Sequence, residues 1–92
     1  MATLSEALTI ALQYHQAGRP QAAEQICRQI LAAEPNYPDA WHLLGVIAHQ
    51  VNQHATAVEY IQRAIALKGD EAAYHSNLGE VYRVLQRIAP RC

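Results

Sequence analysis

Residues 38–69 read PDAWHLLGVIAHQVNQHATAVEYIQRAIALKG, and this stretch decides how the chain folds. Apolar residues recur three and four positions apart on both sides of Asn52, which is the spacing of amphipathic helices. Pro38 suits the first position of a helix, and asparagine suits the left-handed turn that ends one. The stretch therefore predicts a helical hairpin, with helices over about 38–50 and 54–67.

This hairpin is one unit of a repeat with a period of about 34 residues. The positions that align are Ala7, Trp41 and His75; Ile10, Leu44 and Leu78; Ala11, Gly45 and Gly79; and Tyr14, Ala48 and Tyr82. A fixed period of this length is typical of repeat proteins, in which each unit buries its apolar face only by stacking on its neighbours. Proteins of this kind usually bind other molecules, so the period predicts an interaction scaffold.

The motif Trp41-His42-Leu43-Leu44-Gly45, followed by Ala57-x-x-x-Ile61-x-x-Ala64, resembles the tetratricopeptide repeat. The resemblance covers residues 4 to about 87, although Ala48 and Cys27 replace aromatic residues that the family favours. It implies an all-α fold, a right-handed α-solenoid of antiparallel helix hairpins with about five helices. We expect one domain over 1–92, made of repeats at 4–37 and 38–71 and a half repeat at 72–92.

Capping and turn residues mark the ends of the other helices. Thr3-x-x-Glu6 has the form of a capping box, and Gly18 suits a left-handed helix end. Pro20 suits the first position of the second helix. We also expect Asn36 to cap the third helix and Asp70 to cap a fifth helix over about 71–87.

Small and large residues are distributed as close helix packing requires. Gly45 and Gly79 predict close crossings between the helices of a hairpin, with small alanines opposite, because a glycine inside a helix is otherwise unfavourable. We expect Trp41 to be buried between the two helices of its hairpin and the preceding helix. Cys27 is expected to be a small buried group on the inner face of the second helix.

Composition excludes several classes of function. Seven basic and eight acidic side chains among 92 residues give a net charge of −1, so no basic face is expected for nucleic acid. The N-terminus lacks the basic and apolar pattern of an export signal, and no apolar run is long enough to span a membrane. Cys27 and Cys92 do not form a disulfide framework. These features favour a cytoplasmic protein.

Five histidines raise the question of a metal site. His42 and His49 are seven residues apart and share a helix face, and His15 aligns with His49 one repeat earlier. A zinc site needs three or four converging ligands, and no cysteine or carboxylate is spaced to complete this set. No catalytic triad or acid–base pair of carboxylates is evident either. We therefore expect no metal, no cofactor and no enzymatic activity.

The concave surface is the candidate binding site. In tetratricopeptide arrays the first helix of each hairpin lines this surface, and the inward positions in this chain include Gln16 and Asp39. The resemblance implies a groove for a protein or peptide partner, formed by Leu8, Leu12, His15, His42, Leu43, Val46, His49 and Asn77. Chaperone-binding relatives hold a carboxylate there with basic and amide side chains, and of the matching positions only Asn77 fits. We therefore do not expect binding of acidic C-terminal peptides.

The C-terminal helix is expected to mediate self-association. It has no partner helix within the sequence, and its apolar residues exceed what the preceding hairpin can cover. The predicted contact residues are Leu78, Val81, Tyr82 and Leu85, and they favour a homo-oligomer. Two alternatives stay open: the helix is an adequate cap on a monomer, or the chain is the N-terminal, substrate-recruiting fragment of a larger enzyme such as a repeat-bearing glycosyltransferase.

Overall fold

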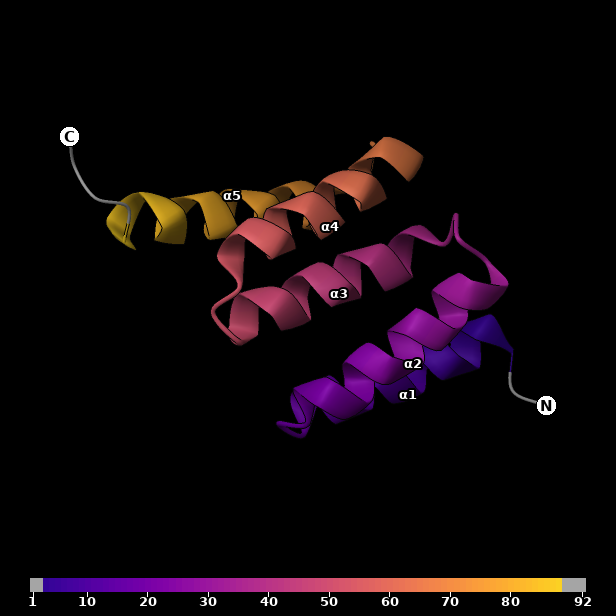
Figure 1. Cartoon of the computed structure of the whole chain (residues 1–92). Coiled ribbons are helices and arrows are strands. Elements are labelled where there is room, and N and C mark those ends of the chain that lie inside the picture. Colours follow the sequence, from indigo (N-terminus) through magenta and orange to yellow (C-terminus); the bar gives the residue numbers. More distant parts are fainter. Residues whose placement is uncertain (1–2, 89–92) are drawn as a thin grey trace.

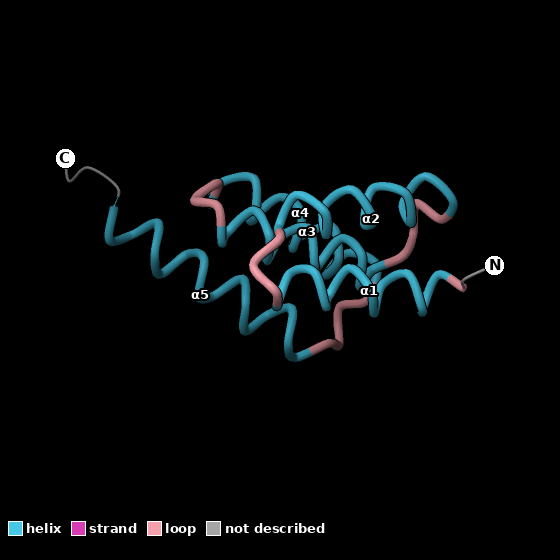
Figure 2. Tube along the Cα trace, turned by 90° about the horizontal axis from the view of Figure 1, so that it is seen from below, coloured by secondary structure: helices cyan, strands magenta, loops and turns pink. Residues whose placement is uncertain are grey.

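The computed structural model describes residues 3–88, and in this range it contains five helices and no strand (Figure 1). The helices are α1 (Leu4–Gln16), α2 (Pro20–Ala33), α3 (Pro38–Gln50), α4 (His54–Leu67) and α5 (Ala72–Ile88). The pairs α1–α2 and α3–α4 are antiparallel hairpins, and α5 packs against α4. Figure 2 shows α2 and α4 along one side of the molecule and α1 and α5 along the other. The predicted all-α solenoid is confirmed.

The helix ends follow the capping residues, with two exceptions. Thr3 and Glu6 form both bonds of the capping box. The predictions that Asn36 and Asp70 cap helices are wrong. With Pro38 as its first residue, α3 has Tyr37 at the N-cap, while the Asn36 N–H donates to Glu34 Oε1 at 3.1 Å. Helix α5 begins at Ala72, one residue after Glu71, so Asp70 is not at its N-cap.

Two left-handed residues close the hairpins. Gly18 has φ 78° and Asn52 has φ 68°, as the sequence predicts. Each follows a first helix and precedes a second one, so equivalent positions of the two repeats make equivalent turns. The short turns force the helices of each hairpin to run antiparallel.

The core is a pair of buried clusters that meet at two aromatic rings. The first cluster contains Ala11, Ala23, Cys27, Leu43, Leu44 and Ile47. The second contains Ala48, Ala57, Ile61, Ala64, Tyr74 and Val81. Trp41 and Tyr60 pack against both clusters, with their ring centroids 5.8 Å apart. The core is therefore continuous from the first hairpin to α5, as stacked repeats require.

The two glycines differ in their surroundings. A Cβ built at Gly45 would meet the Ile61 side chain and would lie 3.1 Å from the Ala57 carbonyl oxygen, so the predicted close crossing of α3 and α4 is confirmed. A Cβ at Gly79 would meet nothing within 4 Å. The prediction of a close crossing at Gly79 is wrong for this structure, because no described helix lies opposite it.

Trp41 is only partly buried, which corrects the prediction that it is enclosed by three helices. Its indole Nε1–H donates to the Pro35 carbonyl oxygen at 2.8 Å, and the Arg63 guanidinium lies 4.9 Å from the ring centroid. The ring thus has a polar, solvent-facing side that Arg63 covers. Cys27 is fully buried, as predicted, and burial raises the pKa of its thiol to about 12.

Candidate functional site: a groove across three helices

A cavity of about 430 Å³ opens along α1, α3 and α5. We call this cavity and its lining the groove. Its lining residues are Leu8, Leu12, His15, Gln16, Asp39, His42, Leu43, Val46 and Asn77. Helical periodicity explains the set, because residues three and four positions apart lie on one face of a helix. The groove therefore combines one face each of the helices that begin successive repeats.

Four of the groove residues are aliphatic. Leu8 and Leu12 come from α1, while Leu43 and Val46 come from α3. Leu43 is buried in the first core cluster, whereas Leu12 is 43% exposed. The floor is therefore held in place by the core, and the rim offers apolar surface to solvent.

A group of polar side chains at the groove joins α3 to α5. The Tyr74 hydroxyl donates to Asp39 Oδ1, and the rings of Tyr74 and His42 have centroids 4.6 Å apart. His42 Nε2 lies 2.6 Å from Asn77 Nδ2, within hydrogen-bonding distance. Four side chains from two helices thus form one connected set.

Burial shifts the pKa of two members of this set, His42 and Tyr74. Removal from water lowers the pKa of the His42 imidazole, although the carboxylates of Asp39 and Glu71 act in the opposite direction. Burial also raises the pKa of the Tyr74 hydroxyl, and its bond to Asp39 adds to that effect. Burial therefore favours the neutral forms of His42, which lines the groove, and of Tyr74, which lies beside it.

Seven of the eight residues predicted for the groove line this one cavity. The exception is His49, which turns instead toward His54, with the two Nδ1 atoms 2.9 Å apart. His15 lines the groove, and its Nδ1 atom is buried without a hydrogen-bond partner.

Tyr74 is a site residue that the sequence did not indicate. Its position on the apolar stripe of α5 predicts packing, and it is 1% exposed. Tyr74 and Asp39 are 35 residues apart, one more than the repeat period. This spacing was the one signal in the sequence that the two side chains lie close together in neighbouring repeats.

The histidines do not form a larger ligand set. Within residues 3–88, no group of three or more His, Cys, Asp or Glu side chains is arranged to hold a metal ion. Over the same range, no helix has both the length and the apolar character to cross a membrane.

The residues predicted for self-association differ in exposure. Val81 is 1% exposed and belongs to the second core cluster, so its side chain is covered within one chain. Leu78 and Leu85 are half-buried against the same cluster. Tyr82 is 42% exposed, and its hydroxyl accepts a hydrogen bond from Gln62 Nε2 at 3.1 Å. Val81 therefore cannot contribute to an exposed apolar surface, because α4 and α5 enclose it.

The chain is similar to a known protein family and to several solved structures. A family model described as tetratricopeptide repeat matches residues 14–80. No curated protein sequence matches the chain significantly. The crystal structure of MamA is similar with a TM-score of 0.82 and 24% identity, covering 91% of this chain and 49% of MamA.

Two further solved structures are similar. A mutant of the Thermobaculum terrenum O-GlcNAc transferase gives a TM-score of 0.82 at 32% identity, over 88% of this chain and 16% of the transferase. The first tetratricopeptide domain of Spaghetti (RPAP3), bound to the HSP90 peptide SRMEEVD, gives 0.84 at 17% identity, over 91% of this chain and 67% of that one. The chain therefore spans 49% of MamA and a small part of the transferase.

Proposed function

Because the chain belongs to the tetratricopeptide repeat family, whose fold is a protein-interaction scaffold, we propose that its groove binds a helix or an extended peptide with apolar side chains. The observation that carries this proposal is the cavity that α1, α3 and α5 line together. Its mixture of aliphatic side chains and a few fixed polar groups is typical of binding sites. The fold is typically a non-catalytic module, and we propose no enzymatic activity for it.

The chemistry of the lining selects the ligand. Leu8, Leu12 and Val46 offer contacts to aliphatic side chains. No lysine or arginine is among the lining residues, and Asp39 is the one carboxylate. A buried anionic group on the ligand would lack a charged partner, which is costly. The proposed ligand is therefore apolar, and any charge that it places near Asp39 is positive.

Leu12 and Ile10 provide a matched test of the groove. Both lie on α1 with nearly equal exposure, 43% and 42%, but only Leu12 lines the groove. Peptides would be selected from a random display library on the wild-type protein, and their affinities for Leu12→Asp and Ile10→Asp would then be measured by calorimetry. We expect Leu12→Asp to abolish binding and Ile10→Asp to retain it. Equal affinities for both variants would show that the peptides bind elsewhere.

We also propose that the chain self-associates through α5. The supporting observation is the open space at Gly79, because the equivalent Gly45 is filled by Ile61 from α4. The half-buried Leu78 and Leu85 and the exposed Tyr82 extend the same helix. A second copy of α5 crossing near Gly79 would cover this surface, and a two-fold dimer is the commonest arrangement of that kind.

Substitution of Gly79 tests this dimer without disturbing the core. Gly79→Glu and Gly79→Ala both improve helix propensity, but only glutamate adds bulk and charge at the open position. We expect light scattering across a dilution series to give a dimer for the wild type and for Gly79→Ala, and a monomer for Gly79→Glu. A monomer mass for the wild type at every concentration would exclude self-association and support α5 as a cap.

An alternative proposal is that the chain is a substrate-recruiting segment of a larger enzyme. The 32% identity to the O-GlcNAc transferase supports it, although the similarity covers only 16% of that protein. Sequencing the complete transcript would distinguish the alternatives, because the enzyme alternative requires a catalytic domain in the same reading frame.

A further inference from the structure

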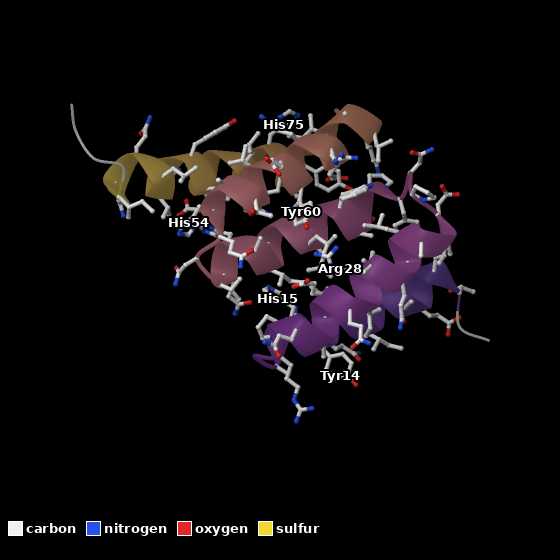
Figure 3. All side chains as sticks on the ribbon, viewed as in Figure 1. Tyr14, His15, Arg28, His54, Tyr60 and His75 are labelled. Carbon is white, nitrogen blue, oxygen red and sulfur yellow. The ribbon has the colours of Figure 1, made fainter. Side chains whose placement is uncertain are left out.

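Two imidazoles face each other across the turn between α3 and α4. The Nδ1 atoms of His49 and His54 are 2.9 Å apart, and the ring centroids are 4.9 Å apart with an angle of 61° between the ring planes. Both side chains are partly buried. Figure 3 shows His54 at this turn, at the start of α4. His49 is absent from the groove lining, so this pair is separate from the site proposed above.

The backbone fixes the distance between the two residues. Asn52 adopts φ 68°, and its N–H donates to the His49 carbonyl oxygen at 3.1 Å. The Gln53 N–H donates to the Ala48 carbonyl oxygen at 2.8 Å. These bonds close the turn between the last residues of α3 and the first residue of α4. The two histidine Cα atoms are thus held by ordered backbone, and a ligand that uses both rings would not have to order the turn.

We propose that His49 and His54 form a two-ligand site for a divalent transition-metal ion of the Ni(II) or Cu(II) class. Imidazole nitrogens bind Zn(II) at about 2.0–2.1 Å, and a similar distance is expected for the neighbouring ions Ni(II) and Cu(II). Two ligands at that distance and at a right angle are about 2.9 Å apart, whereas a tetrahedral angle separates them by about 3.3 Å. The observed Nδ1 separation fits the right angles of tetragonal coordination, which Cu(II) and Ni(II) adopt with nitrogen and oxygen ligands.

Binding requires only a rearrangement within the pair. In the neutral pair, one Nδ1–H donates to the other Nδ1 atom. On binding, the donor ring moves its proton to Nε2, and both rings turn so that their Nδ1 lone pairs point at the ion while the two Nδ1 atoms stay near their present separation of 2.9 Å. No net proton is released and no electron is transferred. Water fills the remaining coordination positions on the solvent side.

The first repeat is a natural control for this site. His15 aligns with His49, but Pro20 stands where the second repeat has His54. The turns are otherwise alike, with Gly18 and Asn52 both left-handed. Consistent with the missing partner, the Nδ1 atom of His15 is buried without a hydrogen bond. The pair is therefore a feature of the second repeat and not of the shared fold.

The test is a titration of the full chain with Ni(II) chloride, followed residue by residue in ¹H–¹⁵N NMR spectra. Ni(II) is used because it does not oxidise the cysteines. We expect substoichiometric Ni(II) to broaden the signals of residues 49–54 first, while the signals of residues 15–20 stay sharp. His49→Gln and His54→Gln should each abolish this selective broadening, and His75→Gln, which alters an exposed histidine elsewhere, should retain it.

Circular dichroism melts would establish that the three variants fold. The proposal is overturned if both turns of the wild type broaden equally, or if all five histidines respond together. Because that comparison uses the wild type alone, it remains decisive even where a variant fails to fold. Broadening of residues 49–54 that persists in a folded His49→Gln or His54→Gln variant also overturns it.

Discussion

Ile61 of α4 occupies the space that Gly45 leaves on α3, and a Cβ at residue 45 would overlap the Ile61 side chain. The first hairpin uses a different combination at the equivalent positions, Ala11 and Cys27, and both are fully buried in the first core cluster. The hairpin with the smaller residue on its first helix, Gly45, thus has the larger residue on its second helix, Ile61. This pairing keeps both hairpins closely packed although their sequences differ.

Gly45→Ala should destabilise the protein, whereas Gly79→Ala should stabilise it. Overpacking a filled core costs about 1–3 kcal/mol, which outweighs the gain of about 0.5–1 kcal/mol from replacing a helical glycine by alanine. A Cβ at Gly79 would meet nothing else of the same chain within 4 Å, and we expect the proposed crossing of a second α5 to leave room for a methyl group, so only the gain of about 0.5–1 kcal/mol remains. Urea unfolding followed by circular dichroism measures both free energies, and a loss at both positions would show that Gly79 is also packed.

A smaller residue at position 61 should relieve the overpacking that Gly45→Ala causes. Adding Ile61→Cys to Gly45→Ala reproduces the residue pair of the first hairpin, Ala11 and Cys27. We expect the double variant to be more stable than the sum of the two single effects predicts, because the added methyl group enters space that the shorter side chain vacates. Additive free energies of unfolding would indicate that the two sites do not interact.

Trp41→Phe should cost about 1–2 kcal/mol of unfolding free energy. It removes the hydrogen bond to the Pro35 carbonyl oxygen, worth about 0.5–1.5 kcal/mol, and weakens the contact with Arg63. Trp41→Ala should cost more, about 3 kcal/mol, near the lower limit for buried tryptophans because the ring is only partly buried. Chemical unfolding measures both, and an unaltered Trp41→Phe variant would show that neither polar contact contributes.

The sequence predicted the fold well because the same spacing of apolar residues and helix-end residues occurs in successive repeats. Most helix boundaries lie near a proline, glycine or asparagine whose backbone preference acts locally, α1 begins at the Thr3 capping box, and the predicted limits of α3 and α4 agree with the structure. Seven of the groove residues could be placed because helical periodicity and the repeat together fix which face turns inward.

The features that the sequence did not predict depend on which of several neighbouring groups a side chain contacts. His49 is on the same side of α3 as the groove residues, but its ring finds a hydrogen-bond partner in His54 across the turn. Val81 belongs to the apolar stripe of α5, and periodicity does not say whether α4 or solvent faces it. Trp41 is large enough to reach the surface, where its indole N–H and Arg63 find polar partners.

Stability should fall as the pH decreases below the ordinary histidine value of 6.5, because of His42. Burial lowers the pKa of His42 in the folded protein, so the unfolded chain binds a proton at a higher pH than the folded chain does. The contribution of the neutral imidazole is complete above pH 6.5 and is lost as the pH falls through the folded-state pKa. Urea midpoints at several pH values between 7.5 and 5 would measure the decline.

His42→Gln is the control for this pH dependence. It removes the titrating group while leaving every other ionisable side chain in place. The variant should lose less stability than the wild type over the same pH interval, so the difference between the two curves isolates His42. Parallel curves would mean that other groups cause the decline.

The groove should not bind an acidic C-terminal peptide such as SRMEEVD, which is bound to the tetratricopeptide domain of Spaghetti (RPAP3). In this chain the lining contains no lysine or arginine, and Asp39 adds a negative charge. A carboxylate brought into the groove would lose its hydration without gaining a cation, so we expect a dissociation constant weaker than about 1 mM. Leu12→Lys places one cation at an exposed groove position and should strengthen binding in a salt-dependent manner. Titration calorimetry at two salt concentrations measures both proteins, and micromolar binding to the wild type would contradict the proposed preference for apolar ligands.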